Sequence, residues 1–124
     1  MLNSELGVGP HMVDVLAPAT VERTEPAPGM LAAQLGHGDR LHAQHVTLGP
    51  GAGIDGDSHR YPHEQLTYVV AGEPIMTIDG VDHALSAGDT LVIPGNVSHS
   101  ARNETEVEAV LLDVFSPPRD DLLG

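Results

Sequence analysis

The chain has 124 residues with 18 acidic and 5 basic side chains, and its formal net charge is −13. This charge repels phosphate backbones and anionic lipids, which argues against nucleic acids and membrane surfaces as partners. Neither cysteine nor lysine occurs, so thiol nucleophiles, disulfides, thiolate metal sites and Schiff-base chemistry are excluded.

The first 29 residues differ in character from the rest of the chain. They lack a steady apolar period, and APATVERTEPAPG (17–29) contains three prolines, which favours a loop over a regular element. We therefore predict an N-terminal arm over 1–29, with a short strand at Met12–Leu16. The chain does not begin with a basic segment and an apolar run, and no apolar stretch approaches a membrane span, so we expect a cytoplasmic protein.

From Met30 onward, short runs rich in Val, Ile, Leu and Thr alternate with turn residues, a pattern typical of β-strands. The stretch IDGVDH (78–83) contains the Asp-Gly pair of a tight hairpin turn. We therefore predict an all-β fold of one domain, with a β-barrel over 30–119 and a C-terminal tail over 120–124. The runs that we expect to form strands are 30–35, 41–48, 65–70, 74–79, 81–85, 90–94, 97–102 and 107–115.

Two sets of regularly spaced residues lie inside this all-β region. The first is GIDGDSHRYPHEQLTYVVAG (53–72) and the second is GDTLVIPGNVSHSARN (88–103). Their glycine, histidine, glutamine, proline and asparagine spacings resemble the two sequence motifs of the cupin family, and the resemblance extends over residues 49–119. It implies a single-domain cupin jelly-roll barrel with one metal ion inside.

The resemblance also implies which residues hold the ion. His59, Gln65 and His99 match ligand positions, whereas Tyr61 stands where the family usually has a second histidine. Because strand side chains alternate, residues 59 and 61 are expected to point the same way. Two neutral imidazoles and an amide oxygen suit one divalent ion of Zn, Ni, Mn, Fe or Cu.

Tyr61 leaves three interpretations open. A phenol binds a divalent ion only after losing its proton, which a metal promotes, so Tyr61 is a candidate fourth ligand. Alternatively, its ring fills space and its hydroxyl contacts a metal-bound water or gives a proton to the substrate. In the third interpretation the pocket has lost its metal.

The end of the chain, DVFSPPRDD (113–121), provides a second resemblance. It is similar to small cupins that open unsaturated uronates, and the scaffold is also that of small cupin polyketide cyclases. This similarity implies that Asp113 is a general acid/base, that Arg119 stabilises an enolate oxygen and that Phe115 packs on the substrate. The alternative role for Asp113 is a structural salt bridge with Arg119. Asn96, which replaces the glycine usual in the second motif, is a departure from the family pattern.

Strand alternation adds further candidates for the pocket. Thr67, two residues after Gln65, should face inward. His42 and His45 cannot face the same way, and we expect His45 to line the pocket. The last strand alternates Val110, Leu112 and Val114 with other apolar residues, which predicts apolar surface on both of its sides and hence a homodimer.

These observations favour an enzyme that carries out non-redox acid–base chemistry, namely isomerisation, cyclisation or elimination. The expected substrate is a small oxygen-rich molecule such as a polyketide or an unsaturated sugar acid. An oxygen-dependent cupin dioxygenase and a binding protein without catalysis remain the alternatives.

Overall fold

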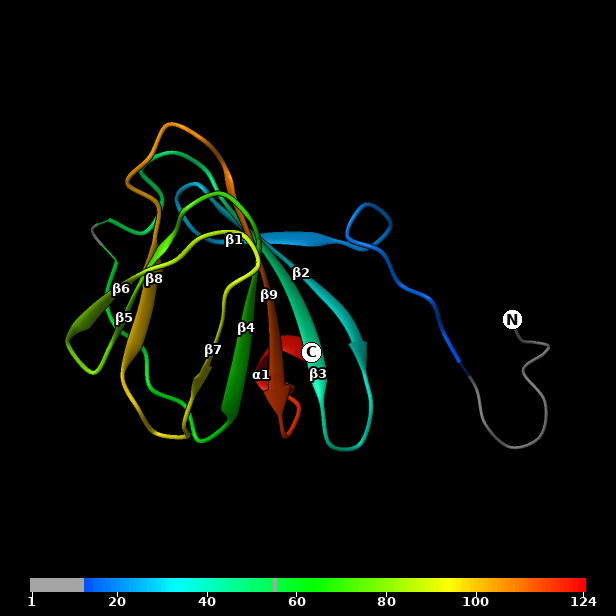
Figure 1. Cartoon of the computed structure of the whole chain (residues 1–124). Helices are drawn as coiled ribbons and strands as arrows, with labels where there is room; N and C mark the ends of the chain where they lie inside the picture. Colours follow the sequence, from blue (N-terminus) through cyan, green and yellow to red (C-terminus); the bar gives the residue numbers. More distant parts are fainter. Residues whose placement is uncertain (1–12, 55) are drawn as a thin grey trace.

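The chain folds into two antiparallel β-sheets that face each other, followed by one turn of helix (Figure 1). The structure is a computed structural model and describes residues 13–54 and 56–124. The larger sheet has six strands in the order β1-β2-β3-β9-β4-β7, and the smaller has three in the order β6-β5-β8. The elements are β1 (Arg23–Ala27), β2 (Met30–His37), β3 (His42–Leu48), β4 (Glu64–Ala71), β5 (Ile75–Ile78), β6 (Val81–Ala84), β7 (Thr90–Ile93), β8 (His99–Arg102), β9 (Ala109–Ser116) and α1 (Asp120–Leu123).

The predicted all-β fold and the eight predicted strands from Met30 onward are confirmed. The predicted hairpin joins β5 to β6 through Asp79 and Gly80, whose φ angles are 50° and 80°. Positive φ at both central residues gives a turn whose twist matches that of the flanking strands.

The strand predicted at Met12–Leu16 is wrong for residues 13–16, which lie outside any strand, and Met12 lies outside the described residues. The chain instead forms β1 at Arg23–Ala27, antiparallel to β2. This strand lies at the edge of the sheet, where Pro26 is tolerated because one side of an edge strand needs no hydrogen-bond donor.

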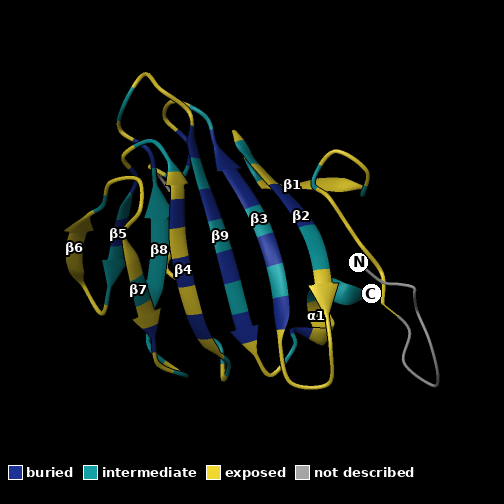
Figure 2. Ribbon diagram, turned by 45° about the vertical axis from the view of Figure 1, so that its right-hand side comes forward, coloured by how far each residue is buried: buried dark blue, intermediate teal, exposed yellow. Residues whose placement is uncertain are grey.

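The space between the two sheets is filled by the inward side chains of alternating positions, and burial alternates along β3, β4 and β9 (Figure 2). The apolar core consists of Ala32, Val46, Leu48, Ala52, Val69, Ala109 and Leu111. In the described part of the chain, no helix has the length and apolar character that crossing a membrane requires.

Candidate functional site

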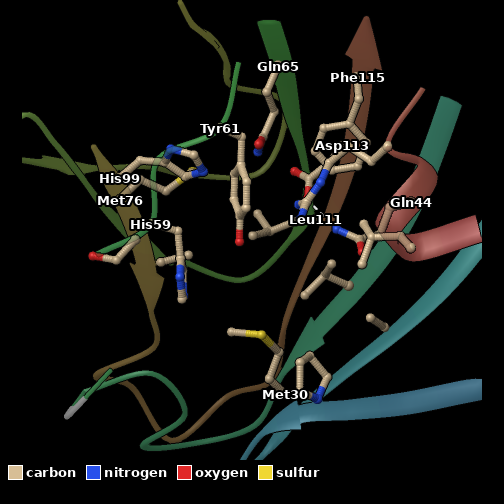
Figure 3. A pocket seen from close by; sticks show the side chains of 17 residues that line it. Met30, Gln44, His59, Tyr61, Gln65, Met76, His99, Leu111, Asp113 and Phe115 are labelled. Atoms are coloured by element: carbon tan, nitrogen blue, oxygen red, sulfur yellow. Dashed lines mark hydrogen bonds between the residues drawn. The ribbon is translucent and has the colours of Figure 1, made fainter. Parts of the chain in front are cut away.

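A cavity of about 180 Å³ lies between the sheets, next to the apolar core. An apolar cavity of about 150 Å³ already holds benzene, so this one has room for a small organic molecule. Figure 3 shows Tyr61 near its centre, with His59 and His99 on one side and Asp113 on the other. The lining residues are Pro26, Met30, Ala32, Gln44, Val46, His59, Tyr61, Gln65, Met76, His99, Ser100, Ala101, Leu111, Asp113, Phe115, Arg119 and Leu122.

The first motif reaches the cavity through a loop whose path depends on Gly53. Gly53 has a φ of 78°, and a Cβ there would lie 2.2 Å from the carbonyl oxygen of Ala101. The loop then meets β8, because the backbones of His59 and His99 exchange hydrogen bonds of 2.7 and 2.8 Å. The two histidines, forty residues apart in the sequence, are therefore brought to the same wall of the cavity.

The predicted metal ligands all line this cavity. Nδ1 of His99 lies 3.1 Å from the carbonyl oxygen of Val97, and that hydrogen bond leaves Nε2 as the free nitrogen. Nε2 of Gln65 donates to Oγ1 of Thr67 at 2.9 Å, which leaves its amide oxygen available. These groups fit a donor set of two imidazoles and an amide oxygen.

Tyr61 lies beside both histidines. Its ring stacks on that of His59, with 6.0 Å between centroids, and its centroid is 5.8 Å from that of His99. Among the described residues, no group of three or more His, Cys, Asp or Glu is placed to hold a metal ion. A tyrosine at the position where the family usually has histidine leaves two imidazoles at this site rather than three.

Arg119 covers the Tyr61 ring. Its guanidinium carbon lies 3.7 Å from the Tyr61 centroid and 5.2 Å from that of Phe115, a cation–π arrangement. The same guanidinium donates to Asp121 through Nη2 at 2.6 Å. The alternative in which Arg119 pairs with Asp113 is therefore wrong, because α1 supplies the carboxylate instead.

Asp113 is a buried carboxyl at the wall of the cavity, with 6% of its surface exposed. Its Oδ1 accepts a hydrogen bond from Thr67 Oγ1 at 2.7 Å, and its Oδ2 accepts one from Gln44 Nε2 at 3.0 Å. Burial raises the pKa of the Asp113 carboxyl above its usual value, although the hydrogen bonds from Thr67 and Gln44 act in the opposite direction. In the described part of the chain, no arginine pairs with it.

Two of the predicted pocket residues need correction. His45 does not line the cavity: it lies opposite Leu112 on the outer face of the sheet, and the inward positions of β3 belong to His42, Gln44 and Val46. Thr67 is fully buried and faces inward as predicted, but it lies behind Asp113 rather than in the lining. Phe115 does line the cavity.

Several lining residues were not predicted. Met30, Met76 and Leu122 are ordinary apolar residues in the sequence, and nothing in their type signals a cavity. The sequence does indicate Gln44, because it is a polar residue at an inward-facing position of β3. Only the pairing of β3 with β9 shows that its side chain contacts Asp113.

Comparison with known proteins identifies the family. The model of the cupin domain family matches residues 44–115, which is more than half of the chain. The fold and the two motifs agree with this match, and the chain belongs to the cupin family.

Three curated relatives match parts of the chain. Protein SchB of Streptomyces halstedii is 41% identical over 75 residues, which cover 59% of this chain and 54% of SchB. The H2HPP isomerase of Bacillus subtilis is 37% identical over 59 residues, which cover 47% of this chain and 25% of that protein. The pectin degradation protein KdgF of Dickeya dadantii is 36% identical over 72 residues, covering 57% of this chain and 64% of KdgF. The chain therefore spans less than two thirds of the length of each of these relatives.

Two solved structures have the same fold over most of their length. KdgF from Halomonas sp. superposes with a TM-score of 0.78 at 29% identity, and the match covers 90% of this chain and 99% of the KdgF chain. The polyketide cyclase RemF from Streptomyces resistomycificus superposes with a TM-score of 0.73 at 18% identity, and the match covers 86% of this chain and 83% of the RemF chain. At that identity the likeness to RemF concerns the fold alone.

Proposed function

We propose that the chain is a metal-dependent cupin enzyme that transfers protons without a redox step, in an isomerisation, cyclisation or elimination. The observation that carries this proposal is the buried carboxyl of Asp113 at the cavity wall, whose pKa is raised by burial. A carboxyl with a raised pKa takes up and returns a proton near neutral pH more readily than an exposed one.

In the proposed reaction, Asp113 removes a proton from a carbon next to a carbonyl group of the substrate. The carbonyl oxygen gains negative charge as the enolate forms, and the phenol of Tyr61 donates a hydrogen bond to it. The guanidinium of Arg119 lies over the Tyr61 ring and supplies positive charge at the same place. In an isomerisation, Asp113 then returns the proton to a different carbon. In a cyclisation, the enolate carbon attacks a second carbonyl carbon of the substrate, the C=O π bond of that carbonyl opens, and its oxygen takes the proton from Asp113. In an elimination, the enolate re-forms its carbonyl as the bond to a β-oxygen breaks, and that oxygen leaves with the proton from Asp113.

We propose His59, Gln65 and His99 as the residues that would hold one divalent ion, while Tyr61 keeps its proton and serves as the hydrogen-bond donor to the substrate. When bound, the ion supplies a Lewis acid that polarises a substrate oxygen. The support for this assignment is the donor set itself and the orientation of the His99 ring by Val97.

The lining of the cavity favours one substrate class over the other. Apolar side chains such as Met30, Val46, Met76 and Leu111 make up much of the wall. Of the described residues, Arg119 is the only arginine in the lining, and because we assign it to the enolate oxygen, no arginine is left there for the carboxylate of a sugar acid. We therefore propose a largely apolar substrate with a reactive carbonyl, of the polyketide kind, rather than an unsaturated sugar acid.

We also propose that two copies of the chain associate through the outer face of the six-stranded sheet. Leu66, Tyr68, Val70 and Val92 on β4 and β7 are 40–55% exposed there, and Leu66 lies directly opposite Val92 and Val114. An exposed apolar surface of this kind is typical of a face that another protein covers.

The test is proton exchange on a model ketone. Tetralone, a small bicyclic aryl ketone, is incubated with the protein in D₂O, and deuterium entry next to its carbonyl is followed by NMR. We expect the protein to accelerate exchange and Asp113→Asn to lower the rate by about two orders of magnitude. An unsaturated galacturonate serves as the competing probe.

The control variant is Glu64→Gln, which removes an exposed carboxyl from the neighbouring strand β4. It should leave exchange unchanged. Equal rates for the wild type and Asp113→Asn with both probes would contradict the proposed function. Consumption of the galacturonate alone would overturn the substrate class.

A further inference from the structure

A row of hydrogen-bonded polar side chains crosses the inner face of the larger sheet beside the cavity. Gln34, Gln44, Asp113 and Thr67 occupy directly opposite positions on β2, β3, β9 and β4, so their side chains share one face. Gln34 Nε2 donates to Gln44 Oε1 at 2.8 Å, and Gln44 Nε2 donates to Asp113 Oδ2 at 3.0 Å. The carboxyl of Asp113 is thus held by a chain of amides that begins two strands away.

His42 stands at the other end of this chain of hydrogen bonds. Its side chain is fully buried, and its ring packs beside Phe115 with 5.3 Å between centroids. Nε2 lies 2.7 Å from Gln34 Oε1, while Nδ1 lies 3.2 Å from the backbone nitrogen of Arg119. One ring therefore contacts both the amides that lead to Asp113 and the segment that carries Arg119.

The direction of every hydrogen bond in this chain is determined by its two ends. The backbone N–H of Arg119 can only donate, so Nδ1 of His42 is an acceptor and a neutral ring carries its proton on Nε2. Nε2 then donates to Gln34, Gln34 donates to Gln44, and Gln44 donates to the carboxylate of Asp113, which can only accept. The chain has no alternative direction while Asp113 is ionised.

We propose that His42 is a positioning residue of the candidate active centre, which holds Arg119 through Nδ1 and, through Nε2, Gln34 and Gln44, orients the carboxylate of Asp113. This inference rests on the proposed function, because it assigns His42 to the residues that carry out the proton transfer. His42 itself lies outside the cavity lining and touches no substrate.

The surroundings of the ring agree with a neutral histidine. Burial lowers the pKa of His42, and the nearby His37, Arg119 and His63 lower it further, whereas Asp121 alone acts in the opposite direction. Protonation would also put a donor on Nδ1, opposite the Arg119 N–H.

Two substitutions separate the two functions of the ring. In His42→Asn, the shorter amide places its oxygen near the former Nδ1 and can still accept from Arg119, but it does not reach Gln34. In His42→Gln, the longer amide can donate to Gln34 but offers no acceptor to Arg119. We expect His42→Asn to lower the kcat of tetralone exchange by at least ~10-fold with little change in KM, because Asp113 is no longer oriented.

His42→Gln should affect the Arg119 amide more than kcat. We expect its kcat to fall by no more than about threefold, because Asp121 still holds the guanidinium of Arg119. The amide hydrogen of Arg119 should exchange at least ~10-fold faster, because its acceptor is lost. In the wild type, ¹⁵N NMR of the histidine side chains should show His42 with the proton on Nε2. The control is His83→Asn, which replaces an exposed histidine on β6 and should change none of these quantities.

A proton on Nδ1 of His42 would overturn the proposal. Equal losses of kcat and of Arg119 amide protection in both variants would also overturn it, because they would mean that His42 contributes only to core packing. The tautomer and the Arg119 amide are measured without any substrate. They therefore decide the role of His42 even if Asp113→Asn shows that the proposed function is wrong.

Discussion

At the scale of single residues, Tyr61 decides how the site differs from a site with three imidazoles. The phenol ring packs beside the rings of both His59 and His99, and the guanidinium of Arg119 covers it. We predict that Tyr61→His increases the bound metal towards one ion per chain, because a neutral imidazole binds a divalent ion without first losing a proton.

Elemental analysis of the purified, untagged protein measures this directly. His59→Ala in the Tyr61→His background is the matched control, and it should lower the metal content again. Unchanged content in Tyr61→His, with or without His59, would contradict the assigned ligand positions.

Asn103 shows how a motif residue supports the site without contacting it. It is fully buried, and its Nδ2 donates to the carbonyl oxygens of Leu48 and Val107 at 2.9 and 2.8 Å. Its Oδ1 accepts from the backbone and the hydroxyl of Thr105 at 3.0 and 2.8 Å. We predict that Asn103→Ala lowers the free energy of unfolding by about 2–4 kcal/mol, because several buried groups lose their partners.

Urea denaturation measures that loss, and Asn96→Gly is the control. Asn96 is exposed and has a φ of 64°, in the left-handed region that glycine adopts most easily and that asparagine also tolerates. Asparagine can therefore replace the glycine of the motif, and we expect Asn96→Gly to leave stability unchanged or slightly higher. A loss below about 0.5 kcal/mol for Asn103→Ala would show that water replaces its hydrogen bonds.

At the scale of elements, the strands from Met30 onward were predictable because apolar alternation and turn residues mark each one. β1 was missed because its sequence, RTEPA, is mostly exposed and shows no apolar alternation. It forms by pairing with β2, and a strand's own sequence does not show that pairing. The glycine and histidine spacings predicted that His59, Gln65 and His99 lie together at one cavity, which the structure shows. Alternation also showed that His42 and His45 face opposite ways, but which of them faces inward depends on how β3 pairs with β9, and a strand's own sequence does not contain that register.

Strand β3 also makes stability depend on pH, because burial lowers the pKa of both His42 and His45. Below about pH 6.5, the unfolded chain binds protons at these rings that the folded chain does not. The free energy of unfolding therefore decreases as the pH is lowered. The raised pKa of Asp113 affects stability in the opposite direction. Its contribution to the free energy of unfolding is present at low pH and is lost as pH rises from 3.8 through the pKa in the folded state. We predict that the change in the free energy of unfolding from about pH 7 to about pH 5.5 is more negative in the wild type than in His42→Gln, because the opposite contribution of Asp113 is common to both proteins.

Denaturant unfolding at these two pH values, with His83→Asn as the control, measures the slope. Each histidine contributes at most about 1.4 kcal/mol per pH unit. A His42→Gln protein with the wild-type slope would mean that the ring titrates equally in the folded and unfolded states.

At the scale of the whole molecule, the two faces of the larger sheet have different environments. The inner face carries the polar row and the cavity wall, whereas the outer face presents apolar side chains to solvent. Pairing of two outer faces would bury these side chains and leave each cavity between its own two sheets. The proposed dimer therefore requires no residue of the partner in the site.

We predict that Leu66→Lys converts the dimer to a monomer, because a charge at the centre of the apolar face would be buried without a partner. Size-exclusion chromatography with light scattering at micromolar concentration measures the mass. The control is Val81→Lys, which places the same charge on an exposed valine of β6 in the smaller sheet, and we expect it to remain dimeric. A wild-type protein that is monomeric at this concentration would contradict the proposed dimer, and loss of the dimer in Val81→Lys alone would place the interface on the smaller sheet instead.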